Sequence, residues 1–206
     1  AGSALFLDEY KKDIKNIKYA DSFVFNPHKW MLTNFDCSLY YVKDEEKLIK
    51  TLEIHPEYLK SSSKNIKNYK DWSIQLGRRF RALKLWFVIR SYGINGIKKY
   101  LKNHINLAKY LKKIIVDDNE FELTTVQNMN MINFRFIPKK SKNNNEINKL
   151  NVKLIHELNK TGKIYLSHTM INDIYSIRMP IGSTSVNIDN IKSSWKLIKK
   201  VSQDII

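Results

Sequence analysis

The stretch DSFVFNPHKWMLTNFDCSLYYVKD, residues 21–44, contains two strand-like segments joined by a turn. DSFVFN and CSLYYVKD are rich in valine, phenylalanine and tyrosine and are bounded by turn residues, so each predicts a β-strand. The Asn26-Pro27 pair ends the first strand, because proline cannot donate to a strand ladder and restricts the residue before it. Lys29 therefore lies directly after a strand end, inside a hydrophobic run.

The position of Lys29 allows two interpretations from the residues alone. Partial burial beside His28 and Trp30 would disfavour the ammonium form, lower the pKa of the amine and leave a nucleophile for carbonyl carbons. Alternatively, the stem of Lys29 packs on Trp30 while its ammonium reaches water, and spacing alone favours this arrangement. His28, taken alone, is more often a satisfied structural group than a ligand.

Length and composition indicate a globular chain of one large domain or two small ones, since 43% of its 206 residues are hydrophobic. No apolar run is long enough to span a bilayer, and the first residues lack the basic-then-apolar order of a secretory signal. The single cysteine, Cys37, excludes an internal disulfide, fits a reducing compartment and is expected to be a buried small hydrophobe. These features predict a cytoplasmic protein without a membrane-spanning part.

The net charge of +16 raises the question of a nucleic-acid partner. The lysines fall at many helix phases and alternate with asparagine, isoleucine and glutamate, which is typical of solvated faces. No zinc-finger spacing, aromatic-and-glycine RNA signature or arginine-rich arm is present, and the sequence has no HExxH, CxxC, GxSxG or GxGxxG motif. We therefore expect neither a nucleic-acid partner nor a metal site.

Beyond the opening stretch, the N-terminal half predicts short helices at 6–17 and 44–53, with a long loop over 54–77 of the kind that is usually functional. From Arg78 the pattern turns helical, and Gly93 and Gly96 interrupt it before a second helix that runs to about residue 115. The apolar residues of the first helix occupy most of its circumference, which predicts a buried helix. These residues are Phe80, Leu83, Leu85, Trp86, Phe87 and Ile89.

The C-terminal half alternates strands and helices in a regular order. Strands are predicted at 120–125, 131–138, 163–169 and 175–182, and helices at 146–162 and 187–204. This strand-strand-helix-strand-strand-helix order predicts an α+β layer with its helices on one face of the sheet.

Three blocks of the sequence resemble the aromatic L-amino acid decarboxylases, the group II family that uses pyridoxal phosphate. ADSFVFNPHKWMLTNFDCSLYYVKD is similar to the family's cofactor-lysine motif, YKDWSIQLGRRFRALKLWFVIRSYG to its second hallmark, and HPEYLK to its mobile catalytic loop. The order and spacing of the blocks agree as well. TGKIYLSHT and IRMPIGST are most similar to the plant tyrosine, dopa and tryptophan decarboxylases, and the resemblance is weakest across 117–150.

The resemblance implies an α/β chain that forms the C-terminal part of the aspartate-aminotransferase-like (type I) fold of pyridoxal-phosphate-dependent transferases. Residues 1–86 would be the end of the large cofactor-binding domain, and residues 87–206 the small α+β C-terminal domain. The activity implied is decarboxylation of tyrosine, dopa, tryptophan or phenylalanine to the amine and carbon dioxide. The sequence alone does not say which of these substrates is used.

The resemblance also assigns the cofactor-binding residues. Lys29 would bind the aldehyde of pyridoxal 5'-phosphate covalently, while Asn26 and His28 fall where the family contacts the cofactor phosphate, which needs donors in fixed positions. Leu76 and Gly77 match the pair whose backbone approaches this phosphate from the other subunit, and a glycine permits such an approach.

Tyr58 matches the loop tyrosine that, in decarboxylases of this family, reaches into the neighbouring subunit's site. There it protonates the α-carbon after carbon dioxide leaves, which requires an acidic O–H within hydrogen-bond reach. The related aldehyde synthases typically carry phenylalanine at this position. Tyr58 therefore favours an amine product over an aldehyde, whereas without the match it would be one loop aromatic among 11 tyrosines.

The resemblance also predicts what this chain lacks. The family's aspartate that pairs with the pyridine nitrogen, its stacking histidine and most of its substrate pocket would lie before residue 1. The segment SIQLG moreover lacks the proline of the family's Gln-Ile-Pro-Leu-Gly. We therefore expect the chain alone to retain cofactor poorly, and to be active as a homodimer, with sites at the subunit interface, once an N-terminal half is supplied. An aldehyde synthase and a truncated, non-catalytic relative that only dimerises stay open as alternatives.

Overall fold

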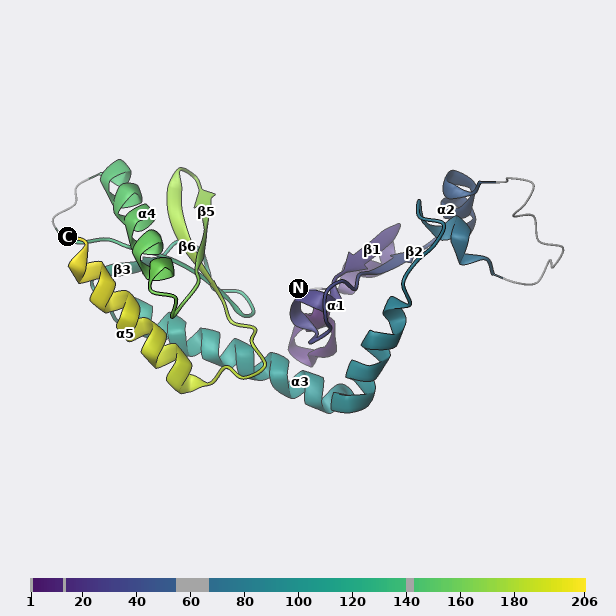
Figure 1. Ribbon diagram of the computed structural model, residues 1–206, viewed down its shortest axis with the longest axis horizontal. Coiled ribbons are helices and arrows are strands. Elements are labelled where there is room, and N and C mark those ends of the chain that lie inside the picture. The colour runs from purple at the N-terminus through teal and green to yellow at the C-terminus, as the bar shows by residue number, and fades with distance from the viewer. Residues whose placement is uncertain (1, 13, 55–66, 140–142) are drawn as a thin grey trace. The chain divides into compact units, whose positions relative to one another are not determined.

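The computed structural model describes residues 2–12, 14–54, 67–139 and 143–206 (Figure 1). The chain divides into two compact units, Ala1–Ile97 and Lys98–Ile206, and the division falls within the long helix α3 (Arg81–Val116). The domain boundary expected between residues 86 and 87 stays a prediction. Each unit is described by itself.

The N-terminal residues form 3-10 turns, although the sequence predicts an α-helix over 6–17. The turns are η1 (Gly2–Phe6), η2 (Asp8–Tyr10) and η3 (Lys15–Tyr19). A short helix is stabilised mainly by burying an apolar stripe, and neither η2 nor η3 contains a buried residue. The expectation of a helix here was therefore wrong.

A two-stranded antiparallel hairpin forms the centre of the first unit. It pairs β1 (Ser22–Phe25) with β2 (Leu39–Val42), in a register that sets Ser22 opposite Val42 and Phe25 opposite Leu39. The helix α1 (Pro27–Trp30) follows β1 directly, with its proline at the start of the helix. Both predicted strands and the strand end at Asn26-Pro27 are thus confirmed.

The predicted helix after the hairpin is confirmed as α2 (Glu45–Leu52), whose first turn is capped because Asp44 accepts a hydrogen bond from the backbone N–H of Lys47. Within the predicted loop, the described residues contain one 3-10 turn, η5 (Tyr69–Trp72).

The N-terminal part of α3 is exposed, which corrects the prediction of a buried helix. Trp86 is 52% exposed and Phe87 57% exposed, whereas Leu85 is buried at 9%. Phe80, Leu83 and Ile89 are exposed as well. An all-round apolar pattern predicts burial only if other elements cover every side, and the described part of the first unit covers only the side of Leu85. Gly93, with a φ of 61°, interrupts the helical backbone, as the sequence predicts.

The second unit contains a four-stranded antiparallel sheet in the order β3-β4-β6-β5. The strands are β3 (Phe121–Leu123), β4 (Met131–Phe136), β5 (Ser167–Ile171) and β6 (Ile174–Pro180), and the helices are α4 (Asn144–Lys160) and α5 (Ile188–Asp204). This order confirms the predicted α+β layer. The third strand begins later than expected, at Ser167 instead of residue 163.

The core of the second unit lies on one face of this sheet. Phe134 of β4 and Ile177 of β6 are fully buried there, together with Leu111 of α3, Leu154 of α4 and Ile198 of α5. The two edge strands β3 and β5 flank this pair. Residues of β4 and β6 therefore share one core cluster with helices that are far apart in the sequence, as the predicted α+β layer requires.

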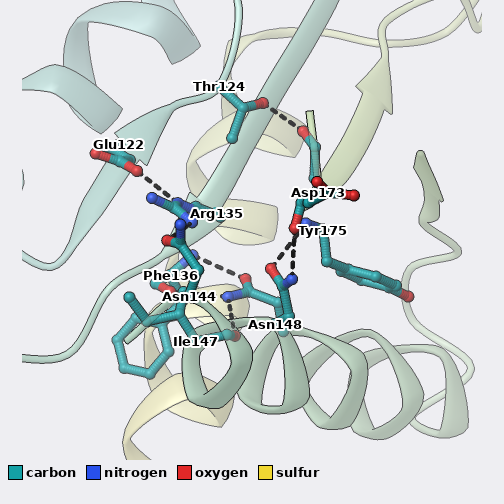
Figure 2. A network of polar contacts seen from close by, with 11 residues as sticks. Glu122, Thr124, Arg135, Phe136, Asn144, Ile147, Asn148, Asp173 and Tyr175 are labelled. Atoms are coloured by element: carbon teal, nitrogen blue, oxygen red, sulfur yellow. Dashed lines mark hydrogen bonds and ion pairs between the residues drawn. The ribbon is translucent and has the colours of Figure 1, made fainter. Parts of the chain in front are cut away.

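Two asparagines of α4 bind the backbone where β4 and β6 separate. The amide of Asn151 accepts from the N–H of Phe136 and donates to the C=O of the same residue, each at 2.8 Å. Asn148 accepts from the N–H of Tyr175 at 2.8 Å and donates to the C=O of Asp173 at 2.7 Å, as Figure 2 shows. These side chains supply the bonds that a neighbouring strand would otherwise make.

Candidate active site

Lys29 is presented to solvent by buried neighbours. It lies on α1, where Pro27 is buried and Trp30 is 6% exposed, while the side chain of Lys29 itself is exposed. Its amine makes no hydrogen bond or ion pair with any described residue. The described chain therefore fixes the backbone around Lys29 and leaves its side chain exposed.

The side chain of Asn26 is oriented by Ser38, which precedes β2. Asn26 occupies the position before α1 where an asparagine commonly caps a helix, yet its side chain makes no capping bond. Instead its Oδ1 accepts a hydrogen bond from the Ser38 hydroxyl at 2.6 Å. This bond occupies the oxygen of the carboxamide and leaves its two N–H donors unused within the part of the chain that the structure describes.

The ring of His28 is held against the backbone of Cys37. Nδ1 lies 3.0 Å from the N–H of Cys37 and 2.8 Å from its C=O, so it accepts from the first or donates to the second according to its tautomer. The Phe35 ring packs against the imidazole in a T-shaped arrangement, with centroids 4.9 Å apart. Nε2 makes no hydrogen bond to a described residue and is the nitrogen available to a ligand.

An ion pair joins the segment of Lys29 to the start of α3. The carboxylate of Asp36 accepts from Nε of Arg81 at 2.9 Å and lies 3.7 Å from the guanidinium of Arg79. The hydrogen bond from Arg81 is the main cause that holds the pKa of Asp36 below its ordinary value. Two blocks that are 45 residues apart are thus connected within the first unit.

Cys37 is a buried structural residue, as expected. Its side chain is 2% exposed, and burial raises the pKa of the thiol, which keeps it in the unreactive protonated form.

Leu76 and Gly77 are exposed, and no hydrogen bond connects them to the turn of Lys29 among the described residues. A Cβ added at Gly77 would meet no atom within 4 Å, so no contact inside the described chain requires glycine there. Tyr58 lies outside the described residues. The structure therefore brings together Asn26, His28 and Lys29, and the roles of all six predicted site residues stay predictions.

Ser38, Asp36 and Arg81 support this turn and were not among the predicted site residues. One signal was available for Asp36: a carboxylate within a hydrophobic run needs a partner, and the arginines of RRFR are the nearest concentrated basic group in the sequence. No comparable signal identifies Ser38, because its bond to Asn26 depends on the pairing of β1 with β2.

Neither a metal cluster nor a membrane-spanning helix occurs among the described residues. No group of three or more histidine, cysteine, aspartate or glutamate side chains is placed there to hold a metal ion. No helix in the described ranges is both long and apolar enough to cross a membrane.

At the turn after β1, three groups of complementary chemistry have no bonding partner among the described residues. These groups are the carboxamide N–H donors of Asn26, Nε2 of His28 and the amine of Lys29. A primary amine can bind an aldehyde carbon covalently, and fixed amide and imidazole donors suit a phosphate. This donor set fits a cofactor that carries both an aldehyde and a phosphate.

Comparisons with known proteins match the chain to one family. The model of the pyridoxal-dependent decarboxylase conserved domain matches residues 1–137. Tyrosine decarboxylase 3 of Petroselinum crispum is 42% identical over 97% of this chain and 40% of its own length, and a phenylacetaldehyde synthase of Arabidopsis thaliana is 41% identical over 97% of this chain and 41% of its own length. The crystal structure of Oryza sativa TDC with PLP and tryptamine superposes with a TM-score of 0.95 at 33% identity, over 100% of this chain and 43% of that one. The predicted fold class is thereby confirmed for the span that the chain covers.

Proposed function

Because this chain belongs to the pyridoxal-dependent decarboxylase family, we propose that the protein containing it decarboxylates an aromatic L-amino acid to the corresponding amine. The chain spans 40% of the length of a tyrosine decarboxylase that it matches. Activity, substrate and partners of the whole protein therefore belong to this proposal. They are supported by the tyrosine decarboxylase among its relatives and by the PLP and tryptamine with which the Oryza sativa structure was solved.

The observation that carries the proposal is the turn after β1. Lys29 would hold pyridoxal 5'-phosphate through its exposed amine, and Asn26 and His28 would donate to the phosphate. When bound, this cofactor supplies the electron-accepting ring that makes loss of carbon dioxide possible. Ser38 and the backbone of Cys37 orient the donors, since they occupy Oδ1 of Asn26 and Nδ1 of His28.

Tyr58 is proposed to return the proton to the α-carbon, which would make the product an amine. A tyrosine decarboxylase and a phenylacetaldehyde synthase both occur among the relatives at similar sequence identity, so overall similarity does not separate the two product classes. A phenol at this position can deliver a proton, whereas a phenylalanine cannot.

The complete site is proposed to need more than this chain. In a cytoplasmic homodimer with its N-terminal parts, Leu76 and Gly77 of one subunit would approach the cofactor phosphate of the other. The open space around Gly77 is compatible with such an approach. The alternative is a non-catalytic role that is limited to dimerisation. The following experiment distinguishes this role from decarboxylation.

The proposal is tested by identifying the lysine that binds the cofactor. This chain is combined with the N-terminal part of the Petroselinum crispum relative, supplied with pyridoxal phosphate, reduced with borohydride and digested for mass spectrometry. We expect the reduced cofactor on Lys29, none in Lys29→Arg, and full labelling in Lys43→Arg, an exposed lysine of the same segment. Labelling of another lysine would refute the assignment, and a labelled protein that forms no product from any aromatic amino acid would favour the non-catalytic role.

Product analysis of the same assembly tests Tyr58. We expect the unmodified protein to release amine from tyrosine, dopa, tryptophan or phenylalanine. Tyr58→Phe should lose most amine formation and, with dissolved dioxygen as the oxidant, release aldehyde, ammonia, carbon dioxide and hydrogen peroxide. Tyr69→Phe, which removes the hydroxyl of another exposed tyrosine, is the control. Unchanged amine formation in Tyr58→Phe would contradict the proposed proton donor.

A further inference from the structure

A hollow in the second unit lies between the turn that follows α4 and one side of α5. Its volume is about 460 Å³. Lys163 and Ile164 line it from the turn, and Lys196, Leu197 and Lys200 line it from the helix. None of these residues belongs to the unit that contains Lys29.

The lysines of α5 differ in whether a carboxylate lies near them. Lys196 and Lys200 are four residues apart and share one side. Lys199 faces elsewhere and is paired, since its amine lies 2.8 Å from Asp118 and 3.4 Å from Glu120. Lys192, seven residues before Lys199, also has a carboxylate near it, at 3.9 Å.

The lysines at the hollow have no such partners. Within the described part of the chain, Lys163, Lys196 and Lys200 make no ion pair and no side-chain hydrogen bond. All three are exposed. Three lysine side chains therefore line one hollow without an ion-pair partner among the described residues, whereas Lys199 of the same helix is paired.

The floor of the hollow is apolar. Ile164 and Leu197 are partly buried and pack against the core of the second unit, so their positions are fixed by the fold. The hydroxyl of Ser193, which also lines the hollow, donates to the backbone of Asp189 at 2.7 Å and is already occupied. The lysines at the rim would thus attract the negative charge of a ligand, and the floor would contact its apolar part.

We propose that this hollow binds a small phosphate monoester with an apolar substituent. A phosphate dianion matches several ammonium groups better than a single carboxylate does, and the substituent would cover Ile164 and Leu197. The volume lies within the range of about 300–1,000 Å³ that is usual for small-molecule sites. The site is separate from the proposed cofactor turn and does not depend on the proposed decarboxylation.

Phenyl phosphate is a suitable probe because it carries a dianion and a ring but no aldehyde that could react with lysine amines. The complete chain with isotope-labelled isoleucine and leucine methyl groups is titrated and followed by NMR. We expect saturable shifts of the Ile164 and Leu197 methyl signals, with an affinity that falls as salt is added. Inorganic phosphate, which lacks the ring, should bind more weakly at the same place.

Matched variants separate a site from the general positive charge of the chain. The triple variant Lys163→Gln, Lys196→Gln, Lys200→Gln should bind phenyl phosphate about tenfold or more weakly, as expected for three exposed charge contacts. The control Lys99→Gln, Lys102→Gln, Lys109→Gln removes three exposed charges from α3 and should leave the affinity within about twofold.

Three results would overturn the proposal. The first is the absence of saturable shifts at Ile164 and Leu197 in the unmodified chain. The second is an equal loss of affinity in both triple variants, which would mean that only net charge attracts the probe. The third is equal binding of inorganic and phenyl phosphate, which would exclude a role for the apolar floor.

Discussion

Lys29 is exposed because residues on either side of it are buried and hold its backbone in place. Pro27 and Trp30 are buried and hold the four-residue helix α1 in place, while Lys29 remains exposed. Asn26 and His28 are constrained in the same way, because Ser38 and Cys37 bind the polar atoms that the ligand would not use. Within the described part of the chain, these contacts leave one amine, one amide and one ring nitrogen available.

The contribution of Asn151 to stability can be tested by a single substitution. Its side chain is fully buried and satisfies both backbone groups of Phe136. Asn151→Ala would leave a buried donor and acceptor without partners, which costs about 1–3 kcal/mol for each such group. We expect urea unfolding to show a loss of this order, and the exposed Asn145→Ala of the same helix to change stability by less than about 0.5 kcal/mol. Equal stabilities of the two variants would contradict the role of Asn151.

At the scale of elements, contacts between distant segments fix the arrangement within each unit. Asp36 and Arg81 connect the turn of Lys29 with α3 in the first unit. In the second unit, His104 of α3 is fully buried and its Nε2–H donates to the C=O of Ser183 at 3.0 Å, which fixes the segment before α5. Burial lowers the pKa of His104.

The lowered pKa of His104 predicts a loss of stability in mild acid. Below a pH of about 6.5, the ordinary pKa of histidine, the unfolded chain takes up a proton that the folded chain does not, so unfolding becomes easier as the pH falls toward the folded pKa. The slope for one group is at most about 1.4 kcal/mol per pH unit. Urea unfolding at pH 5.5 and 7.5 should show this difference in the unmodified chain and a smaller one in His104→Gln, which keeps a donor for Ser183.

His156→Gln is the control, because the His156 side chain is 73% exposed. It should keep the pH dependence of the unmodified chain. If His104→Gln and His156→Gln showed the same dependence, burial of His104 would not be its cause.

At the scale of the whole molecule, the two units differ in how much core they possess. Every buried residue of the main hydrophobic cluster lies between Leu107 and Ile205, within the second unit. The first unit instead exposes a series of large apolar side chains along α3, Trp86 and Phe87 among them. The second unit therefore has the buried surface that an independently folding domain needs.

This difference predicts that Lys98–Ile206 folds when it is produced alone. We expect dispersed NMR spectra and a single cooperative thermal transition by circular dichroism. A shorter fragment, Lys98–Val186, lacks α5 and with it the buried Ile191, Ile198 and Val201, and should not fold. A disordered Lys98–Ile206 would show that its core depends on the first unit.

The sequence by itself determined the parts of this protein that depend on neighbours along the chain. Side-chain alternation and turn chemistry predicted the strands around Lys29, the end of β1 at Asn26-Pro27 and the α+β order of the second unit, because these signals act over a few residues. The three motifs that gave the family are likewise local. The prediction failed at 6–17, where neither η2 nor η3 buries a residue, and along the start of α3, where large apolar residues are exposed.

Only the tertiary structure decided which groups are buried, paired or left free. The bond from Ser38 to Asn26 requires β1 to pair with β2, the pair of Asp36 with Arg81 joins residues 45 positions apart, and Asn151 must reach across to the end of β4. The hollow beside Lys196 and Lys200 likewise exists only because the turn at Lys163 lies against α5. Such contacts join chain segments that are distant in sequence, so a local sequence pattern cannot predict them. The distances between their atoms are set by the folded backbone.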